Sequence, residues 1–103
     1  RNAAGVFAKA ELKSVTAAAA SAAMPDDFRV SITNAPGKAV YPIASFTWLL
    51  VPSKIQDPRK RKIITDFLRW MLADGQKMAE PLGYAPLPNA VIERERKAIA
   101  KVQ

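Results

Sequence analysis

Residues Tyr41–Pro52, with the sequence YPIASFTWLLVP, decide the predicted fold of the chain. The stretch is rich in β-branched and aromatic residues, and both of its alternating faces are apolar. A strand with two apolar faces is typical of a sheet that helices cover on both sides. The two prolines bracket the run, which suits the ends of a strand better than the middle of a ladder. We therefore predict a central, doubly covered strand here.

Upstream of this stretch, the sequence predicts a helix and a second strand. Residues 11–24 are rich in alanine and hold few helix breakers before Pro25, which favours a helix over the alternative of a low-complexity linker. Residues 28–32 alternate apolar and polar side chains, and residues 34–37 (NAPG) supply a turn directly afterwards. This pattern predicts a half-buried strand that ends in a surface turn.

Downstream of it, the sequence predicts three helices. Asp57 and Pro58 are a helix-start signal, and the apolar residues that follow them recur at helical spacing as far as Met71. A short helix is expected from Asp74 to Gly83, where glycine suits a left-handed C-cap. The last helix is expected over residues 88–102, beginning at a proline.

The composition excludes several kinds of chemistry. The 103 residues are of single-domain length, and they include no cysteine and no histidine. Disulfides, thiolate nucleophiles and almost every zinc site are therefore ruled out, and we expect neither a metal nor a cofactor. The four glycines are scattered and form no phosphate-binding loop. We therefore expect that the protein is not an enzyme.

The net charge is +7, from 16 basic and 9 acidic residues, and such an excess can favour acidic partners. Along the sequence the excess is spread, and Arg59–Lys62 is its one cluster. A free-standing basic module that binds acidic partners or nucleic acid through this cluster is thus one alternative. No interleaved aromatics accompany the cluster, so a solvated helix face is the favoured interpretation and no nucleic-acid partner is expected.

Two hydroxyl side chains, Ser45 and Thr47, lie within the predicted central strand. A hydroxyl in a doubly covered strand needs a hydrogen-bond partner, and near the end of a strand that partner can be a ligand oxyanion. Bonding to the neighbouring backbone is the more common outcome. Both residues are therefore kept as possible ligand-proximal hydroxyls.

Three pieces of sequence together resemble the end of a phosphate-binding protein of the PstS family. They are residues 39–51 (AVYPIASFTWLLV), residues 67–76 (FLRWMLADGQ) and residues 82–88 (LGYAPLP), in matching order and spacing. The resemblance implies the C-terminal third of a two-domain, type II periplasmic-binding-protein fold of class α/β, with a central strand flanked by three C-terminal helices. It also implies capture of inorganic phosphate, delivery to an ABC permease, and a periplasmic or cell-surface location.

The same resemblance implies how the chain is divided. Residues 1–40 would end the second domain, and residues 41–103 would supply the hinge strand and the helices that complete the first, with Val40, Tyr41, Pro42 and Ile43 at the hinge. The family's anion ligands lie in segments that have no match here, so no phosphate-binding residue is carried over. Because a lone apolar strand leaves its edges uncovered, we expect the chain to be stable only against the rest of such a protein or when self-associated.

Overall fold

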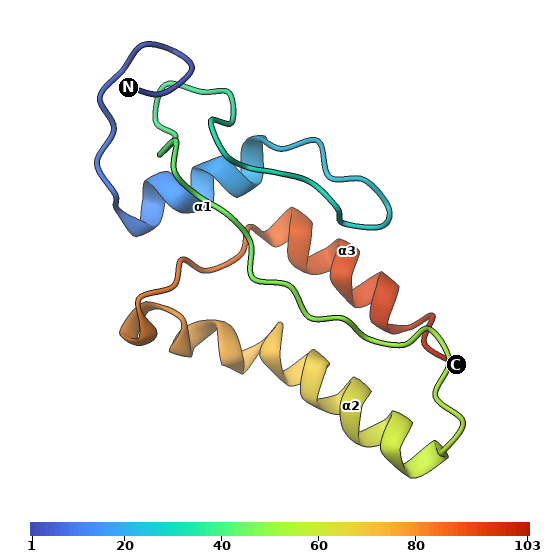
Figure 1. The fold of residues 1–103 in the computed structure, drawn as a ribbon. Helices are drawn as coiled ribbons and strands as arrows, with labels where there is room; N and C mark the ends of the chain where they lie inside the picture. The colour runs from blue at the N-terminus through green and yellow to red at the C-terminus, as the bar shows by residue number, and fades with distance from the viewer.

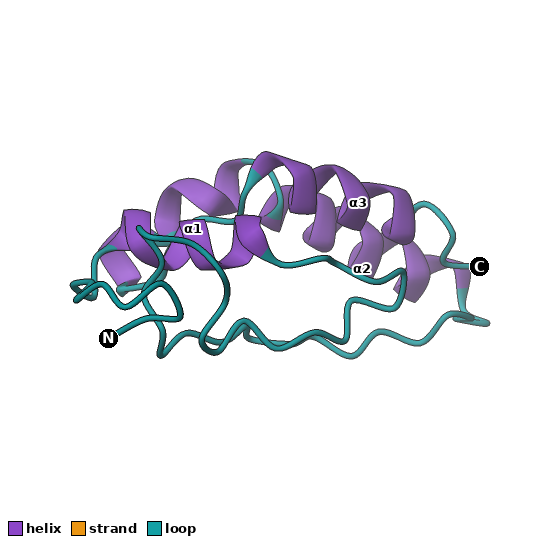
Figure 2. Cartoon of the chain, turned by 90° about the horizontal axis from the view of Figure 1, so that it is seen from above, coloured by secondary structure: helices purple, strands orange, loops and turns teal.

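The computed structural model describes residues 1–103 and contains three α-helices and two short 3₁₀ helices. In chain order these are α1 (Leu12–Ser21), α2 (Pro58–Met71), η1 (Asp74–Met78), η2 (Glu80–Leu82) and α3 (Asn89–Ile99). The helices form one layer, and irregular chain runs along the other side of the molecule (Figure 2). No helix is long and apolar enough to cross a membrane.

Local signals in the sequence explain where these helices begin and end. The Asp57 carboxylate accepts hydrogen bonds from the backbone N–H groups of Arg59 (2.8 Å) and Lys60 (3.2 Å), which caps α2 as predicted. Gly83 ends η2 in the left-handed conformation with φ of 77°, also as predicted. The three longer helices that were expected are therefore confirmed, although α1 and α3 are shorter than their patterns suggested, whereas the single helix expected from Asp74 to Gly83 is divided into η1 and η2.

The predicted α/β fold is wrong, because the structure contains no strand and no sheet. Residues 45–52 make no hydrogen bond at all, so the stretch expected to be the central strand has no neighbouring chain to pair with. The expected strand over residues 28–32 is absent too, and Phe28 adopts a positive φ of 61° that breaks an extended backbone. A ladder needs a partner strand, and this chain supplies none.

The buried side chains fall into two groups along the chain. The first is a cluster within residues 1–44: Ala18, Ala19, Ile32, Ala35, Val40 and Ala44. The other buried apolar side chains, Ile55, Leu72 and Val91, belong to residues 53–103, where α2 contacts both η1 and α3. We call these two parts the N-terminal half (residues 1–44) and the helical half (residues 53–103). Residues 45–52 connect the two halves and run along the helical half, toward the end where the C-terminus lies (Figure 1).

Much apolar surface stays uncovered in the helical half and in residues 45–52. Phe67 stacks on Trp70 with ring centroids 5.9 Å apart, and Phe46 meets Trp48 edge-on at 5.5 Å. Apart from the partly buried Phe46, these rings are about half exposed. Phe46 also packs against the buried cluster of the N-terminal half, whereas the other three rings stay about half uncovered.

Candidate functional site

The predicted hinge begins as a buried and well-bonded segment. Val40 is 3 % exposed and packs in the N-terminal half. The Tyr41 N–H donates to the carbonyl of Ser14 (3.1 Å), and the Pro42 carbonyl accepts from the N–H of Asn34 (2.7 Å). Ile43, by contrast, is 77 % exposed. The structure thus fixes Val40–Pro42 against the N-terminal half, and the buried Ala44, whose carbonyl accepts from the Thr33 hydroxyl, extends this anchored stretch to residue 44.

Asn2 holds this segment in place, a role that was not predicted from the sequence. The residue is 5 % exposed, and its side-chain N–H₂ donates to the carbonyls of Gly37 (3.1 Å), Lys38 (2.9 Å) and Val40 (3.0 Å). Its side-chain oxygen accepts from the N–H groups of residues 4 (3.1 Å) and 6 (3.0 Å). One buried carboxamide therefore fastens the start of the chain to the start of the predicted hinge.

The two hydroxyls expected near a ligand lie beyond this anchored segment. Ser45 and Thr47 are both exposed, and neither side chain makes a hydrogen bond within the chain. The backbone of residues 45–52 has no hydrogen-bond partner either. The nearby carbonyls of Val40, Pro42 and Ala44 accept hydrogen bonds from Asn2, Asn34 and Thr33. No predicted site residue is hydrogen-bonded to either hydroxyl.

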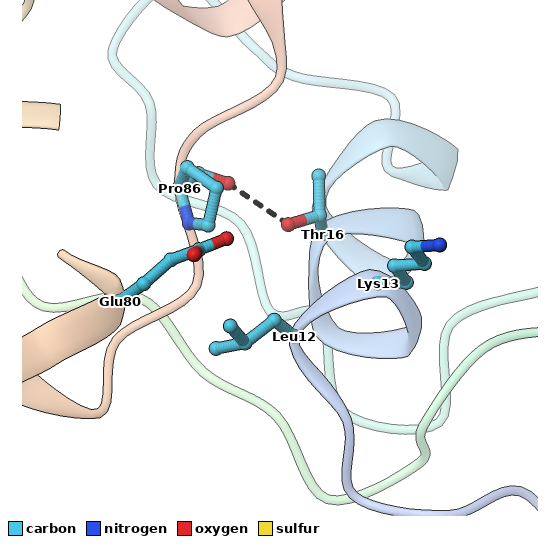
Figure 3. A pocket seen from close by; sticks show the side chains of 5 residues that line it. All are labelled: Leu12, Lys13, Thr16, Glu80 and Pro86. Atoms are coloured by element: carbon cyan, nitrogen blue, oxygen red, sulfur yellow. Dashed lines mark hydrogen bonds between the residues drawn. The ribbon is translucent and has the colours of Figure 1, made fainter. Parts of the chain in front are cut away.

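Few polar contacts join the two halves. The Thr16 hydroxyl of α1 donates to the carbonyl of Pro86 at 2.9 Å, beside a depression of about 290 Å³ that is lined by Leu12, Lys13, Thr16, Glu80 and Pro86 (Figure 3). Arg94 of α3 donates to the carbonyl of Met24 and pairs with Asp26 at 2.9 Å. Thr16 and Arg94 make all the hydrogen bonds between the halves, so the halves are lightly coupled.

The carboxyl groups whose pKa is shifted lie outside the predicted hinge residues. Burial raises the pKa of the half-buried Glu95 carboxyl, which has no ion-pair partner. Bonds to neighbouring cations lower the pKa of the carboxyls of Asp27, Asp66 and Asp74, all on the surface. No group of three or more acidic side chains gathers where a metal ion could bind. None of these four carboxyls belongs to residues 38–44.

The comparisons with known proteins give a consistent family. The chain is 36 % identical over 96 residues to a phosphate-binding protein from Xylella fastidiosa (strain Temecula1), a match that covers 91 % of this chain and 26 % of the relative. It is 31 % identical over 96 residues to one from Pasteurella multocida, with 91 % and 28 % covered. A third, from Methanocaldococcus jannaschii, is 40 % identical over 75 residues, with 68 % and 19 % covered. No family model matches the chain.

All three relatives are named phosphate-binding proteins. The name describes the binding of a solute rather than the catalysis of a reaction. The name that they share is PstS, and the chain belongs to the PstS family over the stretch that is matched. The resemblance noted in the sequence is therefore confirmed. The chain spans about a quarter of the length of the curated relatives it matches.

Proposed function

We propose that the chain is part of a solute-binding protein that captures inorganic phosphate for import by an ABC permease, in the periplasm or at the cell surface. The observation that carries the proposal is the similarity over 91 % of the chain to proteins named for phosphate binding. Within that protein, the chain supplies scaffold and hinge, and the anion ligands come from the remaining length of the protein.

Exposed surface supports the scaffold role. The chain exposes 7511 Å², whereas a compact folded monomer of its mass exposes about 5,700 Å². Its radius of gyration is 15.3 Å, compared with about 13 Å for a compact domain of this length. The excess surface includes large apolar side chains such as Leu50, which is 97 % exposed. Surface of this kind is covered when the chain packs against the rest of a longer protein.

The distribution of hydrogen bonds supports the hinge role. Val40–Pro42 are anchored to the N-terminal half, and the following residues 45–52 carry no hydrogen bond. A connection of this kind can change direction at little cost in enthalpy, because no bond has to break. We place the end of one domain in residues 1–40 and the completion of the other in residues 41–103, with Val40–Ile43 at the hinge and a connection that can bend beyond Ala44.

Isothermal titration tests the assignment of roles. Residues 1–103 alone are expected to show no heat of binding with inorganic phosphate, with sulfate as the matched control anion. Binding of phosphate at micromolar or tighter affinity by this chain alone would show that it carries its own anion ligands, which refutes the scaffold role. The longer protein that contains this stretch is expected to bind phosphate, and its failure to do so would refute the capture function itself.

A further inference from the structure

Two segments that are far apart in the sequence bring their basic residues to one end of the molecule. The Ile55 N–H donates to the carbonyl of Gln103 (2.5 Å), and the Gln103 N–H donates to the carbonyl of Ser53 (3.0 Å). These bonds fasten the end of the chain beside the loop that enters α2, so the last turn of α3 lies near the first turn of α2 (Figure 1).

The positive charge of the protein concentrates at this end. Residues 53–61 and 97–103 hold six basic side chains and one acidic one, whereas the remaining 87 residues hold ten basic and eight acidic. Five of the net seven positive charges therefore belong to these 16 residues. We call their six cations the basic end: Lys54, Arg59, Lys60, Arg61, Lys97 and Lys101.

These cations have no anionic partner within the chain. None of the six ion pairs in the structure includes a member of the basic end. The one acidic side chain in these segments, Asp57, accepts its bonds from backbone N–H groups of α2. Five of the six cations are exposed, and Arg61 is partly so. Like charges held together without compensation favour an external anionic surface.

The surroundings of the basic end fit a lipid surface better than a nucleic acid. Ile63, which is 69 % exposed, lies one helical turn after Arg59 on α2. Cations flanked by exposed aliphatic side chains are typical of proteins that sit at the boundary between headgroups and acyl chains. Residues 53–61 and 97–103 contain no aromatic ring on which a base could stack.

We propose that the basic end binds the anionic phospholipid headgroups of a bilayer surface. The contact is peripheral, with lysine and arginine side chains reaching the headgroup phosphates. It requires no phosphate capture by the protein, so it stands or falls independently of the proposed function. Its strength depends on the fraction of anionic lipid and falls with added salt, since the attraction acts within a Debye length of the surface.

Cosedimentation of the chain with lipid vesicles tests this proposal. We expect binding to vesicles with about one third phosphatidylglycerol in phosphatidylcholine, little binding to pure phosphatidylcholine, and release as salt rises from about 0.05 to about 0.5 M. Each surface cation contributes about a fivefold factor in partitioning. The triple variant K60Q/K97Q/K101Q is therefore expected to partition about a hundredfold more weakly.

A matched control separates position from net charge. The triple variant K9Q/K13Q/K38Q removes the same charge from exposed lysines of the N-terminal half, and we expect it to change partitioning by less than about threefold. Circular dichroism of both variants verifies that helix content is kept. Equal losses in the two triples would overturn the proposal, as would equal binding to neutral vesicles. Tighter, K60Q/K97Q/K101Q-sensitive binding to duplex DNA than to the anionic vesicles would assign the basic end to nucleic acid instead.

Discussion

Replacing Asn2 is the sharpest test of how the N-terminal half holds the predicted hinge. The Asn2 carboxamide donates to three backbone carbonyls and accepts from two N–H groups, almost entirely out of water. Its two N–H hydrogens are shared among three acceptors, so we count about four effective bonds at about 1 kcal/mol each. Asn2→Ala is therefore expected to destabilise the chain by about 2–4 kcal/mol, part of the loss being recovered by water that enters the site.

The Asn2→Asp variant separates hydrogen bonding from shape. It keeps the shape of the side chain but places a carboxylate against the carbonyls of Gly37, Lys38 and Val40, which raises the pKa of the new carboxyl. Since a raised carboxyl pKa favours the protonated form in the folded state, the variant should regain stability as pH falls. Urea unfolding followed by circular dichroism at several pH values measures this change.

The control for Asn2 is Asn89, an exposed asparagine whose side chain makes no hydrogen bond. Asn89→Ala is expected to change stability by less than about 0.5 kcal/mol. Amide exchange at residues 4 and 6 should accelerate in Asn2→Ala and stay unchanged in the control, because these two N–H groups bond to the Asn2 oxygen. A loss below about 0.5 kcal/mol together with unchanged exchange would refute the anchoring role of Asn2.

Three further predictions follow from other positions. Gly37→Ala should destabilise by more than about 1 kcal/mol in urea unfolding, because φ is +132° and a Cβ would lie 2.9 Å from Val40 Cγ2; a neutral effect would contradict that geometry. Asp57→Ala should cost about 1 kcal/mol and speed amide exchange at residues 59 and 60, whereas Asp57→Asn should keep most of the cap; equal losses in both variants would argue against capping. Glu95→Gln should raise the urea midpoint at pH 7, because burial raises the pKa of Glu95 and penalises its charged form; the gain should vanish below the ordinary pKa of 4.5, and a gain that persists there would implicate packing.

The helices could be predicted from sequence because their signals are local. Asp57 with Pro58 starts α2, and Gly83 ends η2. The strands could not, because a strand exists only if another chain segment pairs with it. Residues 32–34 and 42–44 do come together, but the bond from the Asn34 N–H to the Pro42 carbonyl is their one backbone hydrogen bond. The proline ring removes the donor that a return bond would need.

The candidate site was predictable only in part, for the same reason. The position of Val40 in a family motif pointed to the hinge, whereas no role was predicted for Asn2. The Asn2 side chain donates to carbonyls that are more than thirty residues away in the sequence, and no local sequence pattern predicts such contacts. The basic end was missed because residues 53–61 and 97–103 are separate in sequence, so the positive excess appeared to be spread along the chain.

The unbonded connection over residues 45–52 has a consequence for proteolysis. A protease needs a substrate segment that can extend into its cleft, and segments without internal hydrogen bonds reach that state without local unfolding. Leu50 is almost wholly exposed in the middle of this connection. A cut there would divide the chain near its midpoint and leave two fragments joined by little more than the bonds of Thr16 and Arg94. The covalent link through residues 45–52 is therefore the main connection between the two halves.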